Sequence, residues 1–349
     1  MKVELGLTSF GDNSEIYTED GVLPKIPAAE RIRNIVEEIK LADEVGLDVY
    51  GLGEHHRPDY AVSDPVTVLA AAAMETKNIR LSSAVTVLSS DDPVRVYQRF
   101  ATLDALTNGR AEIMAGRGSF IESFPLFGYD LNDYDLLYEE KLELLMQINQ
   151  HEKVTWQGQT REAIHDRGVY PRAVQKELPI YLATGGTPES SARAGHLGLP
   201  ITYAIIGGNP GRFRYNVEVY KAAAREAGHD LSQLSIANHS WGYIADTDEQ
   251  AFREYYPSTL AHHNVIAKER NWGSYDERTY MTEIEHGALF VGGPERVAEK
   301  IIKTVETLGL DRFLIHLPVG SMPHEKIMHA IRLYGEKVKP IVDDYFKDK

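Results

Sequence analysis

The chain has 349 residues, no cysteine, and 52 acidic against 37 basic side chains, which gives a formal net charge of −15. The lack of cysteine excludes disulfides, thiolate metal sites and a cysteine nucleophile, and it is typical of a cytoplasmic protein. The negative charge opposes approach to nucleic acid or to an anionic membrane surface, and no apolar run reaches the roughly 18 residues of a membrane span. We therefore expect a cytoplasmic globular enzyme with neither nucleic acid nor membrane as a partner.

In the first half of the chain, a strand followed by a helix occurs four times. Apolar runs predict strands at residues 3–8, 47–53, 79–88 and 111–115. The helix after the first strand shows in the spacing of Ile32, Ile35 and Ile39 on one face. Asp64-Pro65 and Asp92-Pro93 are N-cap and first-turn pairs that begin the second and third helices.

The second half continues the alternation with two insertions. Residues 151–176 have no helical period and contain VTWQG, which predicts a hairpin before a fifth strand at 178–183. Residues 247–293 exceed one crossover helix and predict a lid or lobe before the eighth strand. The sixth, seventh and eighth strands are expected at 200–206, 234–245 and 312–317. Eight alternations without a linker predict an α/β fold, a single (β/α)8 TIM barrel over residues 1–349.

In such a barrel, functional side chains stand at the carboxyl ends of strands. Glu54 and His55 follow the second strand, and Arg117 follows the fourth between two glycines. A guanidinium makes bidentate contact with phosphate or carboxylate, so Arg117 is a candidate ligand for such a group. Its structural alternative is an ion pair that fixes the barrel rim. The structural alternative for the Glu54–His55 segment is a surface loop. The fifth strand leads into a Gly-Gly turn before a helix, which is an anion site by geometry or simply a tight turn. This segment consists of Thr184, Gly185, Gly186 and Thr187.

Together these groups indicate a mononucleotide cofactor with one phosphate. A dinucleotide fingerprint is absent, because Ile121 stands where the third glycine of GxGxxG would be. A barrel metallohydrolase is an alternative, since His55, His56, His239 and His316 fall near strand ends. Adjacent strand residues point to opposite sides, however, and neither HxH nor HExxH occurs, so we expect no metal site.

Several ordered motifs carry a resemblance to a known family. They include GLGEHHRPDY, the stretch from SSAVTVLSSDDP to GRGSFIESFPLFG, GGTPESSARAGHLGLP, AIIGGNPGRF and FVGGPERVAEKI. Over residues 3–345 the chain resembles the luciferase-like monooxygenases, flavin-dependent TIM-barrel enzymes that include bacterial luciferase and alkanesulfonate monooxygenase.

The resemblance implies roles for individual residues. Glu54 and His55 would be catalytic and lie beside the isoalloxazine, with His55 as a base or hydrogen-bond donor. Arg117 would grip the flavin phosphate. Ala84-Val85 falls where relatives can have a non-proline cis peptide against the flavin. The strand-5 loop would complete the phosphate site with Thr184, Gly185, Gly186 and Thr187.

The implied activity is that of a flavin-dependent monooxygenase, an oxidoreductase that uses reduced FMN and O₂ to oxidise a small organic substrate. Members of the family commonly form dimers and often take reduced flavin from a separate enzyme, so the resemblance further implies a homodimer and a separate NAD(P)H:flavin reductase. A deazaflavin coenzyme with hydride transfer is the first alternative, and a flavin-binding protein without turnover is another. Bacterial luciferase has a cysteine where this chain has Gly116, so light emission is not expected. The substrate walls are expected from the 247–293 lobe and from Phe10, Phe120, Phe124, Tyr203 and Trp241.

Overall fold

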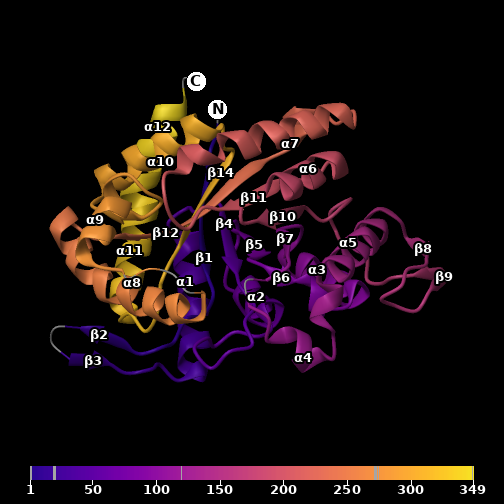
Figure 1. The fold of residues 1–349 in the computed structure, drawn as a ribbon, viewed down its shortest axis with the longest axis horizontal. Helices are drawn as coiled ribbons and strands as arrows, with labels where there is room; N and C mark the ends of the chain where they lie inside the picture. The colour runs from indigo at the N-terminus through magenta and orange to yellow at the C-terminus, as the bar shows by residue number, and fades with distance from the viewer. Residues whose placement is uncertain (1, 19–20, 119, 271–272, 274, 348) are drawn as a thin grey trace.

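Eight parallel strands close into a barrel in the computed structural model, which describes residues 2–18, 21–118, 120–270, 273, 275–347 and 349 (Figure 1). Each strand pairs in parallel with the next, and the last pairs with the first, from Glu4 beside Arg312 to Thr8 beside His316. The predicted TIM barrel is confirmed. Its strands are β1 (Glu4–Ser9), β4 (Val49–Leu52), β5 (Arg80–Ser83), β7 (Ala111–Gly116), β10 (Ile180–Thr184), β11 (Ile201–Ala204), β12 (Ile236–Ile244) and β14 (Arg312–His316).

Helices surround the barrel and turn their apolar faces to it, as Ile35 and Ile39 of the first helix do. Asp92 caps its helix by accepting hydrogen bonds from two backbone N–H groups, as predicted. Asp64 does not cap a backbone group; its carboxylate instead accepts the Thr67 hydroxyl at 2.6 Å. The helices are α1 (Ala28–Glu44), α2 (Pro65–Ala73), α3 (Pro93–Thr107), α5 (Tyr134–Gln150), α6 (Pro188–Leu197), α7 (Arg214–Glu226), α10 (Pro294–Leu308), α11 (His324–Leu333) and α12 (Lys339–Lys347).

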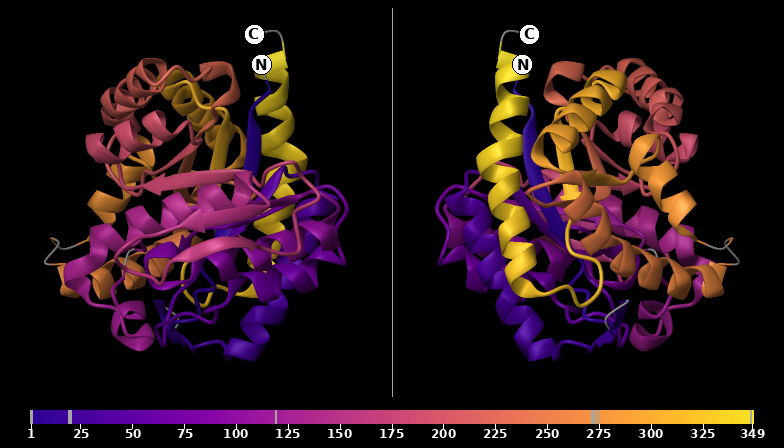
Figure 2. Two further views of the ribbon diagram at one scale, coloured as in Figure 1. Left: turned by 90° about the vertical axis from the view of Figure 1, so that its right-hand side faces the viewer. Right: turned by 90° about the vertical axis from the view of Figure 1, so that its left-hand side faces the viewer.

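Both predicted insertions are present. The first is the antiparallel hairpin of β8 (Lys153–Trp156) and β9 (Ile164–Gly168), and the second comprises α8 (Asp248–Arg270), α9 (Glu277–Glu285) and β13 (Phe290–Gly292), which pairs with β12. Two further elements were not predicted, the hairpin β2 (Ile16–Thr18) with β3 (Gly21–Leu23) and the short helix α4 (Ser123–Phe127). Both lie at the end of the barrel opposite the two chain termini, whose closeness Figure 2 shows.

The expected third strand at 79–88 is divided. β5 ends at Ser83, the Ala84–Val85 peptide bond is cis, and β6 (Thr86–Val87) then pairs separately with β7. The remaining short turns are the 3₁₀ segments Leu88–Ser90, Leu131–Asp133, Pro210–Phe213 and Leu231–Gln233 and the π turn Tyr334–Val338. In the described ranges, no helix is both long and apolar enough to cross a membrane.

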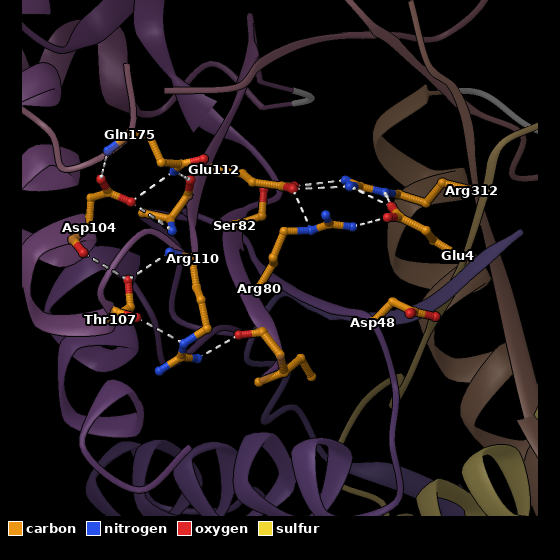
Figure 3. A network of polar contacts seen from close by, with 12 residues as sticks. Glu4, Asp48, Arg80, Ser82, Asp104, Thr107, Arg110, Glu112, Gln175 and Arg312 are labelled. Carbon is orange, nitrogen blue, oxygen red and sulfur yellow. Dashed lines mark hydrogen bonds and ion pairs between the residues drawn. The ribbon is translucent and has the colours of Figure 1, made fainter. Parts of the chain in front are cut away.

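An ion-pair network closes the amino-terminal end of the barrel (Figure 3). Arg312 of β14, with a side chain only 1% exposed, donates two hydrogen bonds to Glu112 of β7 at 2.8 and 3.0 Å and one to Glu4 of β1 at 2.9 Å. Arg80 of β5 contacts the same two carboxylates. The network joins the first or second residues of four strands on different sides of the barrel, so the cavity lies at the opposite end.

Candidate functional site

A cavity of about 640 Å³ lies at the carboxyl ends of the strands. Its wall combines residues from the loops after β4, β5, β7 and β10 with others from β12 and α8. Of the residues selected from the sequence, it contains Glu54, His55, Ala84, Val85, Arg117, Thr184, Gly185 and Thr187. Gly186 is not part of the wall; it has a φ of +99°, and its N–H donates to the Thr184 hydroxyl at 3.1 Å.

The loop that carries His55 is fixed by backbone hydrogen bonds. The N–H of Gly53 donates to the Ser9 carbonyl at 2.8 Å, and the N–H of His55 donates to the Val62 carbonyl at 3.0 Å. The His55 ring stacks on Tyr60 at 4.2 Å between centroids and meets the Phe10 ring at 4.9 Å. Burial in this aromatic setting lowers the pKa of His55 to about 4. The imidazole is therefore neutral at pH 7.

Glu54 is held from two sides. One carboxylate oxygen lies 2.9 Å from Nε2 of His56, and the other accepts the N–H of Val87 at 3.1 Å. His56 packs edge-on to Phe127 and lines a neighbouring hollow of about 300 Å³ instead of the main cavity. The two histidines thus face different spaces, and Glu54 contributes to both walls.

The cis peptide bond between Ala84 and Val85 occurs where the family resemblance implies one. Both residues line the cavity, and Gly116 faces them across the wall. A Cβ atom on Gly116 would lie 2.8 Å from a methyl carbon of Val85. Glycine therefore allows Val85 its position, and a cysteine here would require Val85 to move.

Hydroxyl, guanidinium and backbone donors meet at the amino terminus of α6. Nη2 of Arg117 lies 3.2 Å from the Ser190 hydroxyl, which also accepts the Thr187 hydroxyl at 2.9 Å. Thr187 caps α6 by accepting the Ser190 N–H. Nη1 of Arg117 pairs with Asp135 at 2.5 Å, so the ion pair weighed from the sequence is also present, although the Asp135 side chain is 72% exposed. Such a donor set at a helix amino terminus is suited to a phosphate group.

The far wall of the cavity contains Phe10, Trp241, His239 and His262. Phe120 also lines the cavity, as expected. The other two expected substrate-wall residues do not. Phe124 is fully buried against Tyr134, and the hydroxyl of Tyr203 binds Ser191 at 3.1 Å behind the barrel wall.

The sequence did not single out several wall residues, among them Tyr60, Met114, Tyr134, Thr202, Arg212 and His262. His262 was included only in the histidine-rich 247–293 lobe, and no local pattern separates it from His263. In the part of the chain that the structure describes, no group of three or more His, Asp or Glu side chains is arranged to hold a metal ion.

Comparison with known proteins gives the class of this chain. The family model described as luciferase-like monooxygenase matches residues 4–312. The alkanal monooxygenase alpha chain of Aliivibrio fischeri is 23% identical over 86% of this chain and 90% of its own. The N-acetyl-S-alkylcysteine monooxygenase of Bacillus subtilis (strain 168) is 25% identical over 87% of this chain and 92% of its own.

Solved structures share the fold. Monooxygenase RslO1 from Streptomyces bottropensis superposes with a TM-score of 0.81 at 23% identity, covering 97% of this chain and 99% of its own. The oxygenating constituent of 3,6-diketocamphane monooxygenase from Pseudomonas putida, in complex with FMN, gives 0.76 at 20% identity, with 97% and 98% covered. An F420-dependent secondary alcohol dehydrogenase gives 0.75 at 19% identity, with 98% and 99% covered.

The chain belongs to the luciferase-like monooxygenase family. It is an oxidoreductase of the flavin-dependent kind. The residues present fit a phosphorylated flavin, because the side chains of Arg117 and Thr187 line one end of the cavity and the buried Ser190 hydroxyl holds both in place. A Cβ atom on Gly185 would meet nothing within 4 Å, so the loop leaves open space beside these donors.

Proposed function

We propose that the protein is a monooxygenase that uses reduced FMN and O₂ to oxidise a small organic substrate. The observation that carries the proposal is that one cavity joins the donors around Arg117 to the half-buried side chains of Glu54 and His55. Bound reduced FMN would supply the two electrons with which one atom of O₂ enters the substrate while the other leaves as water.

Each group of this chain then has a defined task. Arg117 and Thr187, positioned by the Ser190 hydroxyl, hold the phosphate and so fix the position of the ring system. The aromatic side chains around His55 exclude water from the reacting atoms. His55 is neutral at pH 7, so it can accept a proton or share its own in a hydrogen bond at the cofactor or substrate. Glu54 lines the same cavity as His55, and its carboxylate is held in place by His56 and by the Val87 N–H.

A deazaflavin-dependent hydride transfer is the second candidate, because the F420-dependent alcohol dehydrogenase shares the fold. The curated relatives named above are both monooxygenases, which favours FMN and O₂. The compact donor set at α6 also suits a terminal phosphate, which carries up to two negative charges, better than a phosphodiester with one.

Two partners are part of the proposal. No dinucleotide fingerprint occurs in the sequence, so we propose that a separate NAD(P)H:flavin reductase supplies the reduced flavin, and rapid NADPH oxidation by the purified protein alone would contradict this. We also propose a homodimer, for which light scattering at micromolar concentration gives the mass directly.

Arg117→Ala tests the phosphate grip. The substitution should weaken FMN binding by about 1.5–3 kcal/mol, roughly ten- to hundredfold, and leave riboflavin almost unchanged, because riboflavin lacks the phosphate. Fluorescence titration of both flavins gives the two dissociation constants. Arg193→Ala is the matched control, since Arg193 lies on α6, pairs with Glu139 and is not part of the cavity wall. Equal losses for both flavins would make Arg117 a structural residue.

A further inference from the structure

Two imidazoles at the far wall of the cavity have no assigned task. His239 of β12 and His262 of α8 both line the cavity, and in each the Nε2 atom is buried and has no hydrogen-bond partner in the described structure. The His239 residue is 7% exposed, and the His262 side chain is 12% exposed. Buried polar atoms are nearly always paired, so two unpaired ring nitrogens on one cavity wall indicate that a ligand completes them.

The environment of His262 sets which of its nitrogens carries the proton. Nδ1 faces Oδ1 of the buried Asp12 carboxylate at 4.0 Å. On the other side of Asp12, Nε2 of His316 lies 3.6 Å from Oδ2, and its Nδ1 lies 3.2 Å from the Thr8 hydroxyl. The 4.0 Å separation is longer than a hydrogen bond, so the carboxylate acts through its charge, which favours N–H on the facing nitrogen and leaves the lone pair of His262 on Nε2.

Packing holds the ring in this orientation. Trp241 meets His262 edge-on, with centroids 4.9 Å apart and an angle of 89° between the planes. Asp12 itself is fixed through its backbone, because its carbonyl accepts Nε of Arg31 at 3.1 Å and its residue pairs with Tyr60 in an isolated bridge. The arrangement of a carboxylate, an imidazole and a free Nε2 is that of an oriented hydrogen-bond acceptor.

Aromatic rings form much of the cavity wall, and its charged side chains are Glu54, Arg117 and Arg212, the last of which donates to the Gly207 carbonyl at 2.9 Å. The rings of Phe10, His55, Tyr60 and Phe120 follow one another at centroid distances of 4.2–6.1 Å. Burial lowers the pKa of His262 to about 4, so this ring is neutral at pH 7. An anion would meet the Asp12 charge behind His262, whereas an uncharged ring compound would pack on the aromatic walls.

We propose that the far end of the cavity is a substrate subsite for an uncharged, ring-sized molecule whose hydroxyl or N–H donates a hydrogen bond to Nε2 of His262. Asp12 is a positioning residue that sets the tautomer, and His239 provides the second ring nitrogen. The inference rests on the proposed function, because it places the substrate beside the flavin, and it names the chemical class that the site selects.

Isosteric probe pairs test the subsite in the FMN-loaded protein. The pairs are benzyl alcohol with ethylbenzene, indole with benzothiophene, and cyclohexanol with methylcyclohexane, and only the first member of each donates a hydrogen bond. Calorimetric titration should show a roughly three- to tenfold preference for the donor in at least one pair, the value of one net hydrogen bond. His262→Phe should reduce this preference to near unity, and Asp12→Asn should reduce it in part. The matched control His263→Phe should preserve it, since His263 contacts the Gly273 carbonyl at 3.2 Å and does not line the cavity.

A tautomer measurement checks the same arrangement without a ligand. Nitrogen-15 spectra of histidine-labelled protein at pH 7 should show His262 protonated on Nδ1 and His316 protonated on Nε2, with the His262 assignment lost in Asp12→Asn. The inference is overturned by His262 protonated on Nε2, by no donor preference in any pair, or by a preference that survives His262→Phe. It is also overturned if His262→Phe weakens FMN binding as strongly as Arg117→Ala, because His262 would then serve the cofactor. Failure of wild-type protein to bind FMN would instead refute the proposed function.

Discussion

His55 and His56 are adjacent in sequence and separate in space. His55 lines the main cavity between Tyr60 and Phe10, whereas His56 contacts Glu54 beside a different hollow. The separation follows from the alternation of a chain that has just left a strand. We therefore propose that His55 contacts the reacting atoms and that His56 acts through Glu54.

Alanine substitutions should reveal this difference. We expect His55→Ala to lower turnover by about 10²–10⁴, the usual contribution of general acid–base catalysis, with little change in reduced-flavin affinity. His56→Ala should have a smaller effect. Product yield with a substrate, or the rate at which oxygen reoxidises bound reduced FMN in stopped flow, measures both. A more damaging His56→Ala, or a His55→Ala protein equal to wild type, would exclude this assignment.

Acid should destabilise the fold through its buried imidazoles. Burial lowers the pKa of His55 and His262 to about 4 and that of His239 and His316 to about 3, from an ordinary value of 6.5. The unfolded chain therefore binds more protons than the folded one below pH 6.5, so the free energy of unfolding must fall as the pH falls from 6.5 towards 4. Burial raises the pKa of Asp12, so at this one group the folded chain binds a proton more readily than the unfolded chain. That single proton offsets part of the loss of stability caused by the imidazoles.

Urea midpoints between pH 7.5 and 5 measure this dependence. His316→Gln should make the profile shallower by about one proton, because it removes one of the buried sites. His196→Gln is the control and should leave the profile as it is in wild type, since the His196 side chain is 53% exposed. A urea midpoint that does not change with pH would contradict this account, because it would show that protonation of these rings leaves the free energy of unfolding unchanged.

At the scale of elements, the two ends of the barrel strands have different tasks. The amino-terminal ends of β1, β5, β7 and β14 carry the buried ion pairs of Figure 3, and the carboxyl ends carry the cavity. Arg312 also lies over the Tyr181 ring at 4.4 Å. The network is therefore expected to contribute to stability and not to catalysis.

Arg312→Met should cost about 3–5 kcal/mol of stability, because it leaves Glu112 charged, buried and short of a partner. The double variant Arg312→Met/Glu112→Leu should recover much of that loss, since both charges are then gone. Urea unfolding measures the free energy, and flavin titration under native conditions should give an unchanged FMN affinity. A stable single variant, or a selective loss of FMN affinity, would contradict the separation of tasks.

Sequence periodicity predicted the barrel because eight amphipathic helices and apolar strands recur in order. It did not predict the hairpin of β2 and β3, which is only three residues on each side, nor the break in the third strand at the cis bond after Ala84. The site residues that directly follow predicted strands, Glu54, His55 and Arg117, could be predicted from the sequence. The position of His262 could not be predicted, because α8 reaches the cavity through tertiary packing that leaves no local pattern in the sequence.

At the scale of the whole molecule, one closed sheet carries both insertions, and we propose that residues 1–349 form one domain. The lobe of α8 and α9 is tied to the barrel rim, since both carboxylate oxygens of Glu283 accept the Gly208 N–H at 3.0 Å. Lys300 of α10 donates to three carbonyls at the end of the lobe, those of Glu283, Ile284 and Leu289. The wall that bears His262 is thus part of a structure with defined anchors.

The choice of cofactor tests the central claim most directly. Equilibrium titration of the purified protein with FMN and with the deazaflavin coenzyme F420, under identical conditions, compares the two candidates in one measurement. We predict that FMN binds at least tenfold more tightly, because we propose that Arg117 and Thr187, joined through the Ser190 hydroxyl, form a compact site for a terminal phosphate. Tighter binding of F420 would contradict the proposal and make the protein a deazaflavin-dependent oxidoreductase.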